Sequence, residues 1–442
     1  MNPQPQAVDT VIEARWVLPI EPRRSVLADH AVVITGGRIV AVLPAAEARV
    51  NYSPRQHVTL ADHALIPGLV NLHTHAAMTL MRGLADDLAL MDWLNRYIWP
   101  VEMRHVSEEF VYDGTRLACA EMLRGGITCF SDMYFFPRAS ARAALEARMR
   151  AVVGLIVIEF PSPYASDAQD YLNKGLALRD ELRNEPLLGF CFAPHAPYTV
   201  SDKSLSQIAT YAGELELPVH MHIHETRDEI NQSVQDHGVR PLLRLERLGL
   251  LGPGLIAVHA IHLEPGEIDQ LARHGCHVAH CPSSNLKLAS GLAPIAALLA
   301  ANINVGLGTD GAASNNRLDM FAEIRLAALL AKGTSGNATA LPAWRALELA
   351  TLGSARALGL DDTIGTLAAG KCADITAVNL SALELAPCYD PLSHLVYAAG
   401  REHVSHVWIN GELMVDNGTL TTIDMREVQA RAAFWHARIK PS

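Results

Sequence analysis

The sequence has 442 residues, of which 50% are hydrophobic and 19% are charged, and its formal net charge at pH 7 is -11. This composition is ordinary for a globular protein, and the length permits a large core in two or three domains or in one α/β barrel with additions. Binding to nucleic acid phosphates or to an anionic membrane surface needs a basic patch, which an acidic balance disfavours. We therefore predict neither a nucleic acid nor a membrane partner.

The cysteines and the first residues indicate the compartment. The seven cysteines are scattered, odd in number and without a CxxC pair, so a disulfide framework is not expected. The opening segment MNPQPQAVDT has neither the basic nor the apolar region of a signal peptide. No window approaches the roughly 18 apolar residues of a transmembrane helix. We predict a cytoplasmic protein.

In chain order, the first predicted elements are β-strands. Segments 9–20, 30–44 and 56–66 have short apolar or alternating runs broken by turn residues, and Gly36-Gly37 marks a hairpin. These strands predict the N-terminal part of a β-domain over residues 1–65.

The middle of the chain alternates between strand-like and helical segments. Eight strand-helix alternations predict a (β/α)8 barrel over residues 66–362, because strands of a parallel sheet read as near-continuous apolar runs. The strand-like runs are 64–70, 126–132, 150–158, 187–193, 218–223, 255–260, 277–281 and 303–308. Helical patterns cover 107–124, with Ser107 as N-cap, and also 203–216, 228–248 and 265–274.

The C-terminal region has the same pattern as the N-terminal one, with short strand-like runs separated by turn residues. Asn410-Gly411 and Asn417-Gly418 each stand beside a strand-like run, as in β-hairpins. We predict that residues 363–442 complete a small discontinuous β-sandwich domain and end in a helix, whose packing partner the sequence leaves open.

Polar residues recur at the ends of the predicted barrel strands. In such barrels catalysis takes place at the C-terminal ends of the strands. The strand-end residues are His73, His75, His195, His222, Glu225, His259, His280 and Asp310. Scattered surface histidines would not repeat this placement.

The first pair has a spacing with a physical meaning. Residues i and i+2 of a strand face the same side, so His73 and His75 project together. With His222 and Asp310 they form a set of three nitrogens and one oxygen suited to Zn²⁺ or Fe²⁺. A divalent ion there would lower the pKa of a water ligand to about 7.

Each of these signals is weak when it stands alone. A single HxH is more often a pair of partly exposed strand residues, a TDG is usually a turn, and a histidine before proline is usually a loop residue. Among the 20 histidines, we expect four to have no role, His220, His224, His274 and His277. His222 is preferred to its neighbours because it stands three residues before Glu225, and the joint pattern favours metal catalysis.

At this point the sequence resembles the amidohydrolase superfamily, and within it the methylthioadenosine/S-adenosylhomocysteine deaminases, which are related to chlorohydrolases and guanine deaminases. The resemblance spans nearly the whole chain. It rests on PGLVNLHTHAAMTLMRGLADDLALMDWL, GITCFSDMY, APHAPYTV, HIHET, HCPSSNLKLASGLAP and GLGTDGAASNN. It implies a distorted (β/α)8 barrel, a β-domain from both termini, one divalent metal and a homo-oligomer.

The resemblance also implies roles, position by position. The metal ligands are His73, His75, His222 and Asp310. Glu225 matches the acid that shuttles protons, His259 the histidine that holds the attacking hydroxide, and His195 a histidine in contact with substrate. Glu102 matches a glutamate that binds ribose hydroxyls, and Ser314 a residue near the far end of the substrate. Trp93 is expected to line an apolar wall, with packing inside a loop helix as the alternative.

The fourth strand lacks the lysine that binuclear members place after it, which favours a single metal, Zn²⁺ or else Fe²⁺. Hydrolytic deamination of a purine adds hydroxide at C6 and expels ammonia, so Asp310 would accept the proton of water while Glu225 protonates the neighbouring ring nitrogen.

Substrate choice depends on the 5′ end of the nucleoside. The amino acid tail of S-adenosylhomocysteine has a carboxylate that favours arginine, which the resemblance places after the third strand. No arginine follows Arg150 there, and Leu155 stands at the expected position. We predict 5′-methylthioadenosine as substrate, with S-adenosylhomocysteine or adenosine weaker, unless Arg138 or Arg82 supplies the charge.

Two other hypotheses remain. The enzyme could act on another amino-heteroaromatic compound, a triazine, a pterin or guanine, in which case Glu102 would have no ribose to bind. The chain could also be a metal-binding or ligand-sensing barrel without catalysis, although a sensor has no use for Glu225, His259 and Asp310 together.

Overall fold

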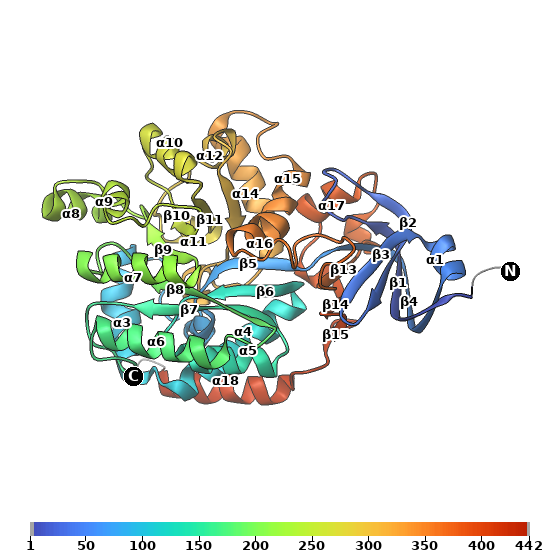
Figure 1. The fold of residues 1–442 in the computed structure, drawn as a ribbon, viewed down its shortest axis with the longest axis horizontal. Helices are drawn as coiled ribbons and strands as arrows, with labels where there is room; N and C mark the ends of the chain where they lie inside the picture. Colours follow the sequence, from blue (N-terminus) through green and yellow to red (C-terminus); the bar gives the residue numbers. More distant parts are fainter. Residues whose placement is uncertain (1–3, 440–442) are drawn as a thin grey trace.

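The computed structural model describes residues 4–439, which form two eight-stranded sheets (Figure 1). One sheet is the parallel barrel and the other is the β-domain at one end of the molecule. The fold class predicted from the sequence is confirmed. The boundaries at 65/66 and 362/363 remain a prediction.

The β-domain is built from both ends of the chain. Its strands follow the order β16-β15-β14-β13-β4-β1-β2-β3. A bridge between Arg38 and Cys372 brings the β3 edge back to the segment before β13, so the sheet folds over on itself as a small sandwich. The elements are β1 (Gln6–Val17), β2 (Leu27–Thr35), β3 (Arg38–Pro44), α1 (Ala45–Asn51), β4 (Tyr52–Pro67), β13 (Ile375–Asn379), β14 (Val404–Ile409), β15 (Glu412–Asp416) and β16 (Thr419–Leu420).

The predicted turns of this domain are confirmed. Gly36 and Gly37 join β2 to β3 with φ of 57° and 75°, a left-handed backbone that favours glycine. Asn410-Gly411 joins β14 to β15, and Asn417-Gly418 joins β15 to β16, all four with positive φ. This is the backbone that a tight two-residue hairpin requires.

The barrel strands pair in chain order and all in parallel. The ring is completed where the Asp310 N–H, just after the last strand, donates to His73 O at 3.0 Å. The strands are β5 (Leu69–Thr74), β6 (Ile127–Asp132), β7 (Arg150–Val157), β8 (Leu188–Pro194), β9 (Val219–Ile223), β10 (Leu255–His259), β11 (His277–His280) and β12 (Asn304–Leu307). Most of their residues are buried, which accounts for the apolar runs.

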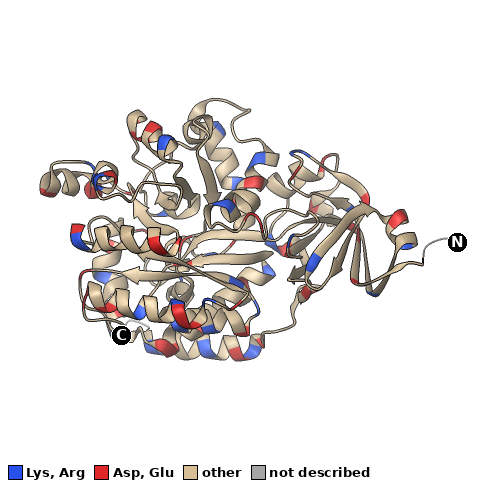
Figure 2. Ribbon diagram, viewed as in Figure 1, with Lys and Arg blue, Asp and Glu red and all other residues tan. Residues whose placement is uncertain are grey.

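Helices surround this ring, and Figure 2 shows both acidic and basic residues dispersed over them. They are α4 (Glu108–Arg124), α5 (Pro137–Glu146), α6 (Ala168–Leu182), α7 (Asp202–Leu215), α8 (Arg227–His237), α9 (Pro241–Arg247), α10 (Pro265–His274), α11 (Pro282–Lys287), α12 (Ile295–Ala300), α13 (Ala312–Asn315), α14 (Met320–Ser335), α15 (Ala343–Glu348), η3 (Leu349–Gly353), α16 (Ser354–Ala357) and α17 (Pro391–Tyr397). Within residues 4–439, no helix is both long and apolar enough to cross a bilayer.

The predicted helices agree with the structure except in one place. Ser107 caps α4 by accepting a hydrogen bond from Phe110 N–H at 3.2 Å, as expected. The single helix predicted over 228–248 is wrong, because it is two helices, α8 and α9. Gly238, with φ of 69°, ends the first helix, and Pro241 begins the second.

The two domains meet at the N-terminal ends of the barrel strands. Arg150, at the start of β7, is ion-paired with Asp374 at 2.9 Å, and both side chains are buried. Thr376 of β13 donates to Gly126 O at 2.8 Å, next to β6. The β-domain therefore covers the end of the barrel opposite to the strand-end histidines, where such contacts serve stability.

The terminal helix α18 (Met425–Ile439) docks on the barrel, which answers the question the sequence left open. It lies along α4 (Figure 1). Trp435 Nε1 donates to Asp113 at 2.8 Å, and Arg431 also binds that carboxylate.

Candidate metal centre and active site

The four predicted ligands lie at the C-terminal ends of three strands, at the mouth of the barrel. His73 lies on β5 and His75 just after it, His222 lies on β9, and Asp310 follows β12. Gly308 permits the approach of β12 to β5, since a Cβ there would lie 2.8 Å from His73 N. Asp310 itself has a φ of 59°, so the backbone turns its carboxylate toward the histidines.

The distances between donor atoms fit a divalent ion. His73 Nε2 lies 3.2 Å from His222 Nε2 and 3.3 Å from Asp310 Oδ1, and His75 Nε2 lies 3.2 Å from the same oxygen. Zinc with ligands at about 2.0–2.1 Å in a tetrahedron separates them by roughly 3.3 Å. These three pairs of atoms therefore lie at the separations that coordination requires. The donor atoms form two clusters that share His73, one with His75 and Asp310 and the other with His222 and His259.

In each of the three histidines, the ring nitrogen that faces away from the site, Nδ1, has a partner of its own. His222 donates Nδ1–H to His195 O at 2.7 Å, and His75 donates Nδ1–H to Met133 O at 2.5 Å. Because a carbonyl only accepts, Nδ1 carries a proton in both rings, which makes Nε2 the ligand atom of each. His73 Nδ1 lies 3.1 Å from His220 Nε2, so His220 supports the third ligand.

The charge state of the site also suits a cation. Burial lowers the pKa of His73 to about 4 and that of His222 well below its usual value, so both are neutral ligands. Burial opposes the charge on Asp310, but the hydrogen bonds with His73 and His75 outweigh it and hold the Asp310 pKa well below its usual range. For His75, burial is outweighed by the Asp310 carboxylate, which raises the His75 pKa to about 9. That imidazole carries a proton which a metal would replace.

Two hydroxyls hold the second oxygen of Asp310. Ser284 donates to Oδ2 at 2.6 Å and Ser314 at 2.7 Å. Ser314 was predicted to lie near the far end of the substrate. It does line the pocket, but its hydroxyl is engaged by Asp310 at the metal centre.

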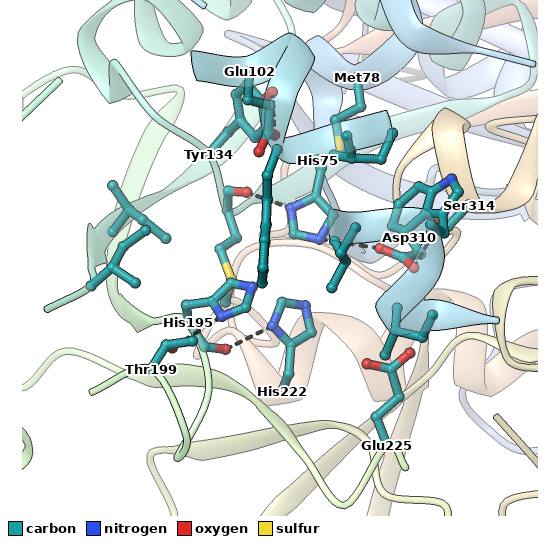
Figure 3. A pocket seen from close by; sticks show the side chains of 18 of the residues that line it. His75, Met78, Glu102, Tyr134, His195, Thr199, His222, Glu225, Asp310 and Ser314 are labelled. Atoms are coloured by element: carbon teal, nitrogen blue, oxygen red, sulfur yellow. Dashed lines mark hydrogen bonds and ion pairs between the residues drawn. The ribbon is translucent and has the colours of Figure 1, made fainter. Parts of the chain in front are cut away.

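Glu225 and His259 lie beside these ligands. His259 Nε2 is 3.8 Å from Glu225 Oε2, and the His259 ring stacks on that of His222. Burial raises the pKa of Glu225, so its carboxyl retains a proton more readily than an exposed one. Glu225 accepts a hydrogen bond from Ser290 Oγ at 3.3 Å and is otherwise directed into the pocket (Figure 3).

A pocket of about 840 Å³, counted out to its open mouth, extends from these groups. Glu102, from α3 (Trp99–His105), lies on its wall and accepts a hydrogen bond from Tyr134 OH at 2.7 Å (Figure 3). Burial raises the pKa of Glu102 to about 7. A buried carboxyl with one oxygen engaged by Tyr134 can accept hydrogen bonds from ligand hydroxyls.

His195 and Trp93 also line the pocket. His195 Nδ1 is 3.1 Å from Thr199 Oγ1, and burial lowers its pKa to about 3, so the ring is neutral. Trp93 belongs to α2 (Leu90–Trp93), which is followed by η2 (Leu94–Ile98). Its indole N–H is buried and has no partner among residues 4–439, which makes it a donor for a ligand as well as an apolar surface.

The pocket wall after the third barrel strand, β7, is apolar, although an enzyme that binds a substrate carboxylate would be expected to have an arginine there. Among the described residues that line it there is neither lysine nor arginine. Leu155 packs against Gly175 of α6 in the core, and Ile156 and Ile158 line the pocket instead. Arg138 is paired with Glu181, and Arg82 with Glu121, both outside the pocket.

The sequence missed several residues that hold the site together. His220 was expected to have no role, yet it contacts His73. Tyr134, Ser284 and Asn285 were not singled out; Asn285 accepts a hydrogen bond from His259 Nδ1–H at 2.8 Å. His220 and His224, which lie two residues before and after His222, differ in direction. His220 faces the site, whereas His224 faces away from it and accepts a hydrogen bond from Leu242 N–H at 3.2 Å.

The chain is similar to known proteins in both sequence and fold. The profile of the amidohydrolase family matches residues 64–414. The chain belongs to the amidohydrolase family. Enzymes of this family depend on a metal, and the family and its deaminase-named relatives bear out the prediction of a hydrolytic deaminase.

Individual relatives of this amidohydrolase cover its whole length. A 5-methylthioadenosine/S-adenosylhomocysteine deaminase of Saccharophagus degradans is 46% identical over 98% of this chain and 97% of its own. A zinc-bound crystal structure of an adenosine deaminase from Xanthomonas campestris is 51% identical, with a TM-score of 0.98 over 98% and 99% of the two chains. A zinc complex of atrazine chlorohydrolase from Arthrobacter aurescens is 25% identical, with a TM-score of 0.89 over 96% and 99%.

Proposed function

We propose that this amidohydrolase deaminates an adenine nucleoside, with 5′-methylthioadenosine as the preferred substrate and methylthioinosine and ammonia as products. S-adenosylhomocysteine and adenosine would be weaker substrates. One observation carries the proposal. Three of the four proposed ligands, His75, His222 and Asp310, line one largely apolar pocket together with Glu225 and the buried carboxyl of Glu102, and the described residues of its lining include neither lysine nor arginine.

We propose one Zn²⁺ ion, with Fe²⁺ as the alternative, held by His73, His75, His222 and Asp310. The separations of their donor atoms support this assignment, as do the backbone carbonyls that bind Nδ1 of His75 and His222. A divalent cation supplies Lewis acidity that lowers the pKa of water to about 7. A proton competes with the cation, because His75 must lose one when it becomes a ligand.

The remaining steps belong to the side chains. Asp310 accepts the proton of the attacking water, which forms the bond to purine C6. His259 orients that water, while Glu225 donates a proton to the adjacent ring nitrogen, so that no bare negative charge develops on the ring. The proton held by Asp310 then passes to the amino group. The C6–N bond breaks and ammonia leaves as the C6 hydroxyl returns a proton to Glu225 and becomes the carbonyl of the product. The raised pKa of the buried Glu225 suits a group that must give up a proton.

The nucleoside end of the substrate lies against the other wall. Glu102 can accept bonds from the two ribose hydroxyls, held in place by Tyr134. His195 and the indole N–H of Trp93 offer further polar contacts to the ligand. Ile156, Ile158 and Phe160 form an apolar surface that suits a neutral thioether better than a carboxylate tail.

A substrate panel on zinc-loaded enzyme tests the proposal. We expect kcat/KM for methylthioadenosine to exceed that for S-adenosylhomocysteine by about tenfold or more, since a buried carboxylate without a partner costs over about 1.4 kcal/mol. A preference for S-adenosylhomocysteine would contradict this assignment. Turnover of triazines, pterins or guanine without turnover of nucleosides would instead support the alternative in which Glu102 has no ribose partner.

The state of the cysteines bears on the cell compartment in which the enzyme acts. All seven cysteines, which lie in the described part of the chain, are without disulfides, in keeping with a reducing compartment. We propose that the enzyme acts in the cytoplasm. A homo-oligomer stays a prediction from the resemblance.

A further inference from the structure

Behind His259, three polar atoms are buried with no partner among residues 4–439. They are both ring nitrogens of His280 and the amide nitrogen of Asn285. Each of these residues is only 2% exposed. Burial lowers the pKa of His280 to about 3, so the ring is neutral and has one donor and one acceptor to satisfy. Buried polar groups are rarely left without a hydrogen bond.

His280 and Asn285 line one small cavity, at the end of β11 and on α11. Its other walls are mostly apolar and include Leu292 and Ile295. The volume open to the centre of a water molecule is about 10 Å³. A site for one water needs roughly that much space and at least two polar partners. This cavity has that volume, and His280 and Asn285 are the two polar partners.

We infer that this cavity holds one ordered water, which joins His280 to the Asn285 amide and makes both residues positioning residues for His259. The inference rests on the proposed function only in the role it gives to His259. Asn285 Nδ2–H donates to the water, and the water bonds a ring nitrogen of His280. The other end of the amide, Oδ1, accepts from His259 Nδ1–H at 2.8 Å.

The water stabilises the orientation of the amide that the structure shows, with Oδ1 toward His259 and Nδ2 toward the cavity. An Asn side chain can present either its oxygen or its nitrogen to a neighbour, and its hydrogen-bond partners select between them. In this orientation Nδ2–H donates to the water while Oδ1 accepts from His259 Nδ1–H. His259 then carries its proton on Nδ1 and turns a bare Nε2 toward Glu225 and the ligand cluster. Reversal of the amide would favour the other tautomer, which cannot accept a hydrogen bond from the attacking water.

Two measurements on the zinc-loaded, full-length protein test the inference without relying on activity. A high-resolution crystal structure is expected to show a water about 2.7–3.2 Å from both Asn285 Nδ2 and a His280 nitrogen. Nitrogen NMR of 15N-histidine-labelled protein is expected to show His259 protonated at Nδ1. Absence of the water, or a proton on Nε2 of His259, would overturn the inference even if methylthioadenosine is a good substrate. If no nucleoside is turned over, the proposed function fails while these two readouts still decide the present inference.

Variants of His280 test the positioning role. H280F keeps the ring volume but removes both nitrogens, and H280Q keeps a donor and an acceptor. We expect H280F to lower kcat by about tenfold or more, as the loss of an outer partner does at metal sites. KM should stay within about twofold, because the lost interaction acts in the transition state. H280Q should recover most of kcat.

The matched control is H277F, at the other end of the same strand, where His277 bonds Asn304 at the base of the barrel. It should leave kcat unchanged. Wild-type kcat in H280F, or an H280Q variant as slow as H280F, would contradict the positioning role. If H280F does not fold, the wild-type crystal structure and NMR tautomer decide alone.

Discussion

Replacing Glu225 by glutamine should separate proton transfer from metal binding. The two side chains have nearly the same shape, but the amide cannot donate a proton to the purine ring and then take one back. Among residues 4–439, Glu225 is not in the groups whose donor atoms cluster for a metal, and Ser290 is the one side chain that donates a hydrogen bond to its carboxyl, at 3.3 Å. The Glu225→Gln substitution should therefore leave the ligand set intact.

The expected loss can be bounded. A positioned general acid contributes about 10²–10⁴-fold, which corresponds to roughly 3–5 kcal/mol in the activation barrier. Since burial raises the pKa of Glu225, the folded protein bears a cost for ionising it that a neutral amide lacks. We expect kcat to fall by about 10²–10⁴-fold, with bound zinc and Tm not reduced.

The assay is the change in ultraviolet absorbance as an adenine ring becomes a hypoxanthine ring, with zinc measured by mass spectrometry. The matched control is Glu348→Gln, which alters another buried carboxyl, ion-paired with Arg345 far from the pocket. It should lower Tm without lowering kcat. Near-normal turnover of Glu225→Gln, or loss of zinc along with activity, would refute the reasoning.

The remaining predictions concern the ligands and the ribose wall. His73→Ala should lose bound zinc and activity together, and an active, zinc-loaded variant would contradict its assignment as a ligand. Glu102→Gln should raise KM for methylthioadenosine by roughly tenfold to a hundredfold, as expected for losing a hydrogen bond to a charged group worth about 1.5–3 kcal/mol, while zinc content is unchanged; an unaltered KM would remove Glu102 from the ribose site. Because the pKa of His75 is raised to about 9, zinc must displace its proton below that pH, so zinc affinity of the apoenzyme should rise about tenfold per pH unit from about pH 6 to 8. Competition titrations with a chelator of known pH dependence measure this slope, and a flat profile would show that His75 is neutral before zinc binds.

Most of the fold was predictable because its signals are periodic. Eight apolar runs separated by helical segments define a parallel barrel, and the glycine pairs place the hairpins of the β-domain. The helix over 228–248 was wrong because its hydrophobic pattern continues across Gly238, and a glycine inside a pattern is also compatible with an unbroken helix.

The convergence of the proposed metal ligands was predictable because they lie at strand ends. His73 and His75 lie two apart, and a carboxylate follows the last strand. His220 was misjudged for a geometric reason. It faces the barrel interior like His222, but one layer deeper, where it contacts His73 from beneath. Spacing alone gives the face of a strand and not the depth within the barrel.

Other residues of the site carry no signature in the sequence. Ser284 and Asn285 lie on a short helix after β11, and Tyr134 lies in the turn after β6. Serine, asparagine and tyrosine are common in loops, and only the folded chain brings their hydroxyl and amide groups to Asp310, His259 and Glu102. The side of β7 that faces the pocket was likewise misassigned, since a shift of one residue exchanges Leu155 for Ile156.

The most direct test of the whole account is an anomalous difference map from crystals of the zinc-loaded enzyme, with data collected on both sides of the zinc absorption edge. The account predicts a single peak with nitrogen ligands at about 2.0–2.1 Å from His73, His75 and His222 and a carboxylate oxygen of Asp310 at about 2.0–2.2 Å. A peak at other side chains, a second metal in the mouth of the barrel, or four side chains directed away from a common centre would contradict it.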